Sequence, residues 1–217
     1  DLPEKIEDTV MAQLTGEQRK LYLANQDRIA QQVQHREAGE FKKDKLKVLA
    51  ELTKLRQICC DPRLHYEDYK AGSAKLDTCM ELVHGALDGR HRILLFSQFT
   101  GMLDIIGKRL AKEDIAFLKL TGASSKESRA KMVAQFQAGE VPVFLISLKA
   151  GGVGLNLTAA DVVIHYDPWW NVAAQDQATD RAHRIGQQHT VTVYKLIAKD
   201  TIEERIMQMQ ESKRDLV

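Results

Sequence analysis

Apolar residues in the last two thirds of the chain form short continuous runs, separated by longer segments with helical spacing. Such runs, rich in Val, Ile, Leu and Phe, are typical of strands buried on both faces of a parallel sheet. Between them, apolar positions recur every three or four residues, as in residues 99–110, which predicts amphipathic helices. The predicted strands are residues 92–96, 116–120, 143–147, 161–166 and 191–197. Repeated strand–helix units predict an α/β fold in which helices cover both faces of a parallel sheet.

The first 72 residues have a different pattern, because they carry many charges and their apolar positions have helical spacing. Pro3 predicts an extended segment at the start, and the Thr-x-x-Gln spacing of residues 15–18 predicts a capped helix after it. Gly39 is expected to interrupt that helix, and Pro62 is expected to stop a second one. The polar residues 67–73 form a predicted linker.

These patterns divide the chain into three parts. We predict a helical region at residues 1–72, the α/β domain at 73–200 and a C-terminal helix at 201–217. The Thr-x-x-Glu spacing of residues 201–204 predicts the start of that last helix, and the Ser-x-x-Glu spacing of residues 124–127 predicts the start of another.

The composition excludes several classes of protein. With 44% hydrophobic and 28% charged residues, the chain has the composition of an ordinary globular protein. A net charge of only +1 means that nucleic-acid binding needs a local basic surface. No apolar run reaches the roughly 18 residues of a membrane span, so we predict no contact with a membrane. Cys59, Cys60 and Cys79 lack Cys-x-x-Cys spacing, so they are expected to be buried thiols in a reducing compartment, not zinc ligands or disulfides.

Polar residues follow the predicted strands at their carboxyl ends. Ser97, Thr121, Ser147 and Asp167 each lie at or just after such an end. Because the carboxyl ends of parallel strands meet at one edge of the sheet, where ligands bind in this class of fold, these residues predict a site there. The glycine-rich residues 151–154 follow one of these strands and would let backbone amides approach an anion, although a tight strand-to-helix turn is the more common role of such glycines.

Two arginines near the end of the α/β region are the principal candidates for chemistry. Gln177, Arg181 and Arg184 have i, i+4 and i+7 spacing, which places them on one face of a helix. Arg keeps its charge and binds phosphate through a planar fork of donors. The alternative is a solvated helix in which Asp180 pairs with Arg184.

Four motifs in order support a family resemblance. Residues 176–187, which read DQATDRAHRIGQ, resemble the last helicase motif of the Swi/Snf-type ATP-dependent DNA translocases, within helicase superfamily two. Residues 94–99, 147–157 and 165–171 resemble the fourth motif, the fifth motif and the segment after the fifth. The resemblance covers residues 73–217 closely and the first seventy residues more loosely. It implies that the chain is a C-terminal RecA-like motor lobe, preceded by a helical protrusion and inter-lobe linker and followed by a brace helix.

The resemblance also implies an ATP site shared between two lobes. Arg181 and Arg184 would reach the phosphates of ATP bound on a first lobe, and Gln177 would couple the nucleotide to DNA. Gly152 and Gly154 would face the nucleotide.

Backbone contacts to double-stranded DNA are implied for a second set of residues. These are Ser97, Gln98, Thr121, Gly122, Ser147, Lys149 and Trp170. For the hydroxyl residues the alternative is simple capping of helices, and for Trp170 it is packing. His165 and His183 are expected to be structural.

Two motor motifs are missing from this sequence. It contains no Gly-x-x-x-x-Gly-Lys-[Ser/Thr] loop and no Asp-Glu-x-His segment after a strand, so the phosphate cradle and the Mg²⁺ ligands are expected on the first lobe. The chain alone is therefore expected to hydrolyse little ATP, and its start without Met suggests a fragment. Expected partners are double-stranded DNA, the first lobe and DNA-bound protein complexes. The short protrusion favours a bacterial source and hence the nucleoid, whereas a eukaryotic source would mean the nucleus.

Three other functions are compatible with parts of the pattern. The chain is alternatively a non-catalytic interaction module for nucleic acid or protein, or a lobe of a strand-separating helicase. An unrelated nucleotide-binding enzyme fits poorly, because the Gly-x-Gly-x-x-Gly fingerprint of dinucleotide-binding folds is missing.

Overall fold

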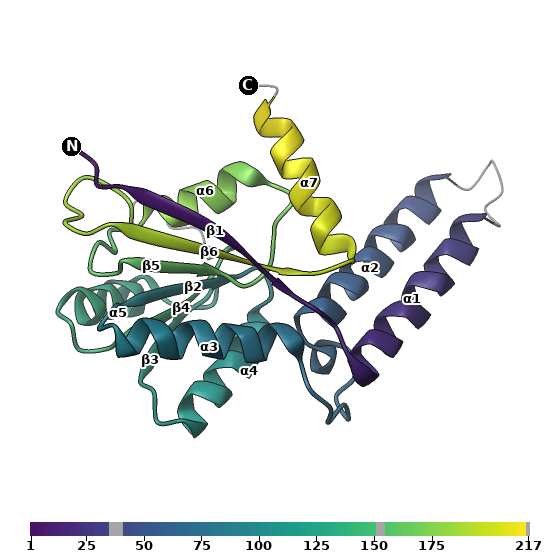
Figure 1. Ribbon diagram of the computed structural model, residues 1–217, viewed down its shortest axis with the longest axis horizontal. Coiled ribbons are helices and arrows are strands. Elements are labelled where there is room, and N and C mark those ends of the chain that lie inside the picture. Colours follow the sequence, from purple (N-terminus) through teal and green to yellow (C-terminus); the bar gives the residue numbers. More distant parts are fainter. Residues whose placement is uncertain (35–40, 151–154, 216–217) are drawn as a thin grey trace.

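A six-stranded parallel sheet forms the centre of the computed structural model, which describes residues 1–34, 41–150 and 155–215 (Figure 1). The strands lie in the order β1-β6-β5-β2-β4-β3. Their bounds are β1 (Lys5–Ala12), β2 (Ile93–Ser97), β3 (Phe117–Leu120), β4 (Val143–Ser147), β5 (Val162–His165) and β6 (Val191–Ala198). All five strands predicted from apolar runs are confirmed.

Strand β1 was not among the predicted strands. It pairs in parallel with β6 from Lys5, opposite Val191, to Ala12, opposite Ala198, and so lies at an edge of the sheet. Most of its side chains are exposed, and Ala12 alone among them is buried. An edge strand of this kind has no continuous apolar run, so the pattern indicated only an extended segment. The sheet therefore includes residues from the range predicted as helical.

Helices cover both faces of the sheet, as predicted. Helices α3 (Ala74–Asp88) and α4 (Thr100–Lys112) pack on one face, in a core that includes Leu95. Helices α5 (Lys126–Gln137) and α6 (Val172–Asp180) pack on the other face, in a core that includes Leu94 and Phe96. Successive residues of β2 thus point to opposite faces and all of them are buried, which is why its sequence reads as one apolar run.

A helical hairpin extends from one end of the sheet (Figure 1). It consists of α1 (Gly16–Gln34) and α2 (Phe41–Cys60), and a short helix, η1 (Pro62–Leu64), follows it. The hairpin shares a third core with the last helix, α7 (Ile202–Asp215), in which Tyr22, Ile58 and Ile206 are buried. Gly39 lies outside the described residues.

The predicted helix starts are confirmed. At the start of α7, Thr201 Oγ1 accepts from Glu203 N at 3.1 Å as a cap, whereas the other two predicted caps are wrong in detail. Helix α1 begins at Gly16, but Gln18 does not cap it. Gln18 donates to Ile58 O (2.9 Å) and accepts from Ala74 N (3.0 Å), the first N–H of α3, so it ties three helices together. Helix α5 is capped by Ser125, which accepts from Ser128 N at 3.1 Å, and not by Ser124.

The three cysteines are free and buried, as expected. Burial raises the pKa of all three thiols, that of Cys79 to about 12, so they stay protonated and unreactive. None of the helices in the described ranges is both long and apolar enough to cross a membrane.

Candidate nucleotide and nucleic-acid site

The polar residues at the strand ends do meet at one edge of the sheet. Ser97 and Ser147 end the neighbouring strands β2 and β4 and lie opposite each other. Thr121 directly follows β3, and Asp167 comes two residues after β5. Because all the paired strands are parallel, these four positions share the carboxyl edge, which confirms the placement predicted from the sequence.

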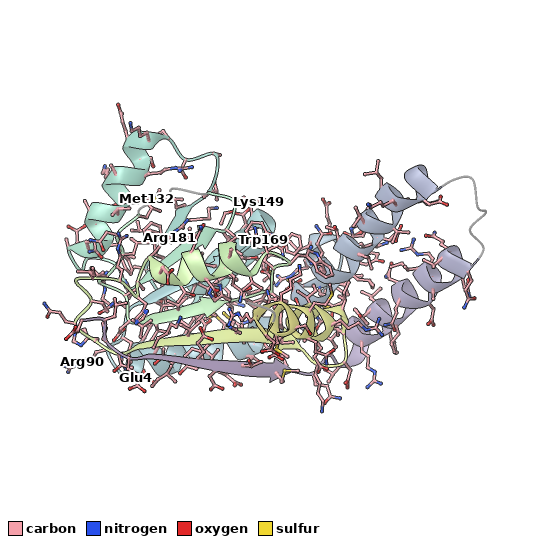
Figure 2. All side chains as sticks on the ribbon, turned by 90° about the horizontal axis from the view of Figure 1, so that it is seen from above. Glu4, Arg90, Met132, Lys149, Trp169 and Arg181 are labelled. Atoms are coloured by element: carbon pink, nitrogen blue, oxygen red, sulfur yellow. The ribbon has the colours of Figure 1, made fainter. Side chains whose placement is uncertain are left out.

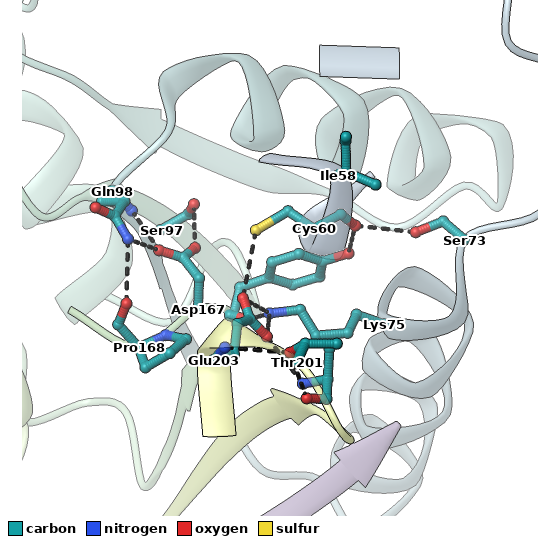
Figure 3. A network of polar contacts seen from close by, with 12 residues as sticks. Ile58, Cys60, Ser73, Lys75, Ser97, Gln98, Asp167, Pro168, Thr201 and Glu203 are labelled. Carbon is teal, nitrogen blue, oxygen red and sulfur yellow. Dashed lines mark hydrogen bonds and ion pairs between the residues drawn. The ribbon is translucent and has the colours of Figure 1, made fainter. Parts of the chain in front are cut away.

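Asp167 is buried and organises the loop after β2 (Figure 3). Its carboxylate accepts hydrogen bonds from Ser97 Oγ and from Gln98 Nε2, the latter at 2.8 Å. Gln98 Nε2 also donates to Pro168 O at 3.1 Å, and Ser97 Oγ accepts from Phe99 N at 3.1 Å. The side chains of Ser97 and Gln98 are therefore buried and engaged within the protein. Neither caps α4, because no side-chain capping bond forms at its N-cap residue Phe99, and their contact with DNA phosphates stays a prediction.

The other predicted DNA contacts differ in their exposure. Ser147 is buried and its Oγ accepts from Lys149 N at 3.3 Å, so it shapes the turn, whereas the Lys149 side chain is exposed. Thr121 is half-buried and its Oγ1 accepts from Ala123 N at 3.3 Å. Gly122 beside it is exposed, and a Cβ built on it meets no atom within 4 Å. Lys149 and the turn at Gly122 are thus accessible to a backbone phosphate.

The arginine motif does not lie on a single helix. Helix α6 ends at Asp180, and the chain turns through hydrogen bonds from Ala182 N and His183 N to Thr179 O, both at 3.1 Å. The prediction that Arg184 continues the helix face of Gln177 is therefore wrong. Gly186, in the loop beyond α6, has a φ of +104°, which glycine adopts without strain.

Arg181 has an unusual environment for an arginine. Its guanidinium carbon lies 5.7 Å from the centre of the Phe96 ring, and its buried Nη1 has no hydrogen-bond partner among the described residues. Burial lowers the pKa of Arg181, and the positive charge of Arg129 on α5 lowers it further. Arg129 was not predicted from the sequence, because nothing in the local pattern brings α5 to the end of α6.

Arg184, which follows Arg181 in the same motif, is half-buried. Its Nη1 donates to Leu155 O at 3.1 Å. Neither arginine forms an ion pair with a carboxylate of a described residue, so the alternative pairing of Asp180 with Arg184 is not found there. Guanidinium groups held in place without a carboxylate fit a polyphosphate. Gly152 and Gly154, the predicted backbone contacts, lie outside the described residues.

Both tryptophans lie just before the start of α6, and Figure 2 labels Trp169 together with Arg181 and Lys149. Trp169 packs on the core beneath α6, and Trp170 packs on the core of the hairpin. Gln177 is exposed on α6. Arg56 of α2 lies near Trp170, with its guanidinium carbon 5.7 Å from the Trp170 ring centre, and no local sequence pattern predicts this contact.

Comparisons with known proteins show the family and the fold of this chain. A family model described as helicase conserved C-terminal domain matches residues 74–186. An uncharacterized ATP-dependent helicase of Mycoplasma pneumoniae is 40% identical over 100% of this chain and 21% of its own length. The putative ATP-dependent helicase/translocase YwqA of Bacillus subtilis is 41% identical over 100% of this chain and 24% of its own length. The structure of the Sulfolobus solfataricus SWI2/SNF2 ATPase core in complex with dsDNA matches with a TM-score of 0.86 and 38% identity, over 99% of this chain and 45% of that one.

This chain belongs to the helicase C-terminal domain family and is a lobe of the Swi/Snf type. The resemblance noted in its motifs and the RecA-like fold are therefore confirmed. The lobe spans 21% and 24% of the length of the two bacterial relatives, so most of such a protein lies outside it.

In this Swi/Snf-type lobe, a buried ion pair lies next to the candidate site (Figure 3). The sequence did not predict this pair. Lys75 Nζ lies 2.9 Å from both carboxylate oxygens of Glu203 and also donates to Tyr166 O. The pair joins the first turns of α3 and α7 to the segment that carries Asp167. No group of residues in the described ranges is arranged to hold a metal ion.

His165 and His183 have structural contacts, as expected. His165 is buried against Phe96, and its Nε2 lies 2.8 Å from Thr179 Oγ1. Burial and the nearby Lys195 lower the pKa of His165 to about 3, so the ring is neutral. His183 Nε2 lies 2.8 Å from Pro3 O and holds the N-terminal segment against the arginine motif.

Proposed function

We propose that this chain is the second motor lobe of an ATP-dependent double-stranded DNA translocase. In this proposal it supplies Arg181 and Arg184 to an ATP site shared with a first lobe, and it grips the DNA backbone at the carboxyl edge of its sheet. The observation that carries the proposal is the buried Nη1 of Arg181, which has no partner among the described residues. Relatives named as ATP-dependent helicases support the use of ATP.

The arginines fit the phosphates of ATP. A guanidinium group stays charged under partial burial and offers a planar fork of donors, so Arg181 and Arg184 would stabilise negative charge that develops on the transferred phosphoryl group. Arg129 adds positive charge on the α5 side. The carboxylates that hold the Mg²⁺ of Mg·ATP belong to the first lobe in this proposal. Gly152, Gly154 and Gln177 would complete the side of the nucleotide that faces this lobe.

The DNA contacts we propose are the exposed ones. Lys149, Gly122 and Thr121 would contact phosphates through an ammonium, a backbone amide and a hydroxyl, and Trp170 would lie against the strand. Ser147 contributes by shaping the turn that carries Lys149. Contacts of this kind position a protein on DNA without reading its sequence, so binding should be sensitive to salt. The dsDNA named for the Sulfolobus structure supports this half of the proposal.

The two halves suggest a simple cycle. ATP held between the lobes draws Arg181 and Arg184 towards its phosphates and closes the cleft. Hydrolysis changes the charge that the arginines neutralise, and the cleft opens. Because each lobe grips the backbone, repeated closure advances the protein along the duplex.

The division of the chain follows from this arrangement. Residues 1–72 would form a protrusion and the linker to the first lobe, except that β1 is part of the sheet. Residues 73–200 would form the lobe itself and residues 201–217 the brace helix. The protein would act where DNA is held, in a nucleoid or a nucleus, on naked or protein-bound duplex.

DNA-stimulated ATP hydrolysis by the parent protein tests the proposal. Arg184→Ala should lower kcat by about 10³-fold, the order found for arginine fingers in other nucleotide hydrolases, while duplex binding persists. Arg205→Ala on the exposed side of α7 is the matched control and should leave turnover unchanged. Unchanged turnover in Arg184→Ala, or DNA binding by the wild type that ignores ATP, would instead support a non-catalytic interaction module.

A further inference from the structure

Arg56 on α2 lies between two aromatic rings that come from the α/β domain. Its guanidinium carbon is 5.6 Å from the centre of the Phe99 ring and 5.7 Å from the centre of the Trp170 ring. Phe99 follows β2 and Trp170 follows β5, and these two strands are neighbours in the sheet. A residue of the helical hairpin therefore connects two loops of the sheet edge.

Arg56 is buried, and no carboxylate of a described residue forms an ion pair with it. The residue is 7% exposed, and its buried Nη2 has no hydrogen-bond partner among the described residues. The guanidinium lies near two aromatic rings instead, and ring faces attract a cation through their quadrupoles. The aromatic faces lower the free-energy cost of burying the guanidinium charge but do not neutralise it. A positive charge therefore remains next to the Trp170 ring.

Hydrogen bonds fix the backbone of the same two loops, and the core of the hairpin packs against Trp170 without a polar contact to its indole ring. Gln98 Nε2 bonds to Asp167 and to Pro168 O, which ties the two loops together just before Phe99 and Trp170. The Trp170 side chain itself is half-buried. Arg56 is the described cation that meets its ring.

We propose that Arg56 is a positioning residue for Trp170. It holds the indole at the edge of the sheet and adds a buried, unneutralised positive charge beneath it, where the phosphate backbone of duplex DNA is the compensating anion. The DNA part of this proposal rests on the proposed function, in which Trp170 contacts the duplex. The positioning part depends only on the Arg56 contacts.

The identity of the residue matters in this arrangement. The broad planar guanidinium lies within 5.7 Å of the centres of two rings at once, whereas a lysine ammonium is a compact and more strongly hydrated charge. Arg56→Lys therefore keeps the charge and weakens the contact with both rings. Lys54→Met is the matched control, because Lys54 lies on the same helix with its Nζ 5.3 Å from the Tyr66 ring centre, in a contact that does not involve the sheet edge.

The experiment uses this chain with Trp169→Phe, which leaves Trp170 as its only tryptophan. Acrylamide quenching of Trp170 fluorescence reports how well the indole is held, and titration with a fluorescent duplex oligonucleotide reports binding. Arg56→Lys should increase quenching and weaken duplex binding by about fivefold, the fold-change of an ordinary cation–π contact. Lys54→Met should change neither quantity.

Circular dichroism and urea unfolding show whether each variant folds. If Arg56→Lys fails to fold, Arg56→Met fills the same space without a buried charge and supplies the same readout. Quenching and binding that match the Lys54→Met control would overturn the proposal. Trp170→Ala separates the positioning part of the proposal from its DNA part. If this variant binds duplex DNA as tightly as the wild type, the DNA contact of Trp170 in the proposed function is wrong. In that case the quenching measurement alone decides whether Arg56 positions the indole.

Discussion

Replacing Lys75 by Met should lower the free energy of unfolding by about 3–5 kcal/mol. The side chains of Lys75 and Glu203 are 0% and 1% exposed, so each charge depends on the other. Burial alone would lower the pKa of the Lys75 ammonium, but the adjacent Glu203 carboxylate raises it above its ordinary value. Without Lys75, Glu203 keeps Ala198 N as its backbone donor at 2.8 Å, and Tyr166 O loses the Lys75 ammonium. The variant therefore loses an ion pair and leaves a buried carboxylate without a cation.

A double-mutant cycle measured by urea unfolding separates this effect from lost packing. Lys75→Met with Glu203→Leu removes both charges, so it should be more stable than Lys75→Met alone and close to the wild type. Lys20→Met is the control, because the side chains of Lys20 and its partner Glu17 are 76% and 61% exposed. Ion pairs this exposed contribute about 1 kcal/mol or less to the free energy of unfolding. If Lys75→Met lowers the free energy of unfolding no more than Lys20→Met does, the reasoning is refuted.

Two further predictions concern pH and salt. The pKa of His165 is about 3 in the folded protein, below its ordinary value of 6.5. Between these two pH values the unfolded chain therefore binds one more proton than the folded protein. The free energy of unfolding should fall by about 1.4 kcal/mol per pH unit as the pH drops through this window. His165→Gln should thus lose less stability than the wild type between pH 7 and pH 5 in urea unfolding; equal losses would contradict the assignment. Lys149→Ala in the parent protein should reduce the slope of log binding constant against log salt by about one, as expected for one lost phosphate contact, whereas Lys108→Ala on the exposed side of α4 should not. An unchanged slope in Lys149→Ala would remove Lys149 from the DNA contacts.

The central strands were predictable because burial on both faces leaves a direct mark on the sequence. Every residue of β2 and of β4 is buried, so both read as continuous apolar runs. Strand β1 leaves no such mark, since its faces are largely exposed and its position depends on pairing with β6, more than 180 residues along the chain. Local patterns record burial, and they do not record long-range pairing.

The candidate site was predictable in its location and less so in its contacts. The carboxyl edge followed from strand ends and parallel topology alone. Whether a hydroxyl there faces solvent was not predictable, because the contact of Ser97 with Asp167 spans 70 residues. The contact between Lys75 and Glu203 spans 128 residues and likewise has no local signal. The early end of α6 was missed because the Arg181–Arg184 spacing is compatible with a helix or a turn.

Steady-state ATP hydrolysis by the parent protein with Arg181→Ala and Arg181→Lys tests the central claim most directly. The account predicts that kcat falls by about 10³-fold in Arg181→Ala and only partly recovers in Arg181→Lys, which keeps a charge but lacks the fork, while duplex affinity persists. If both variants turn over ATP at the wild-type rate, Arg181 does not act on the nucleotide, and the shared ATP site proposed for this lobe is contradicted.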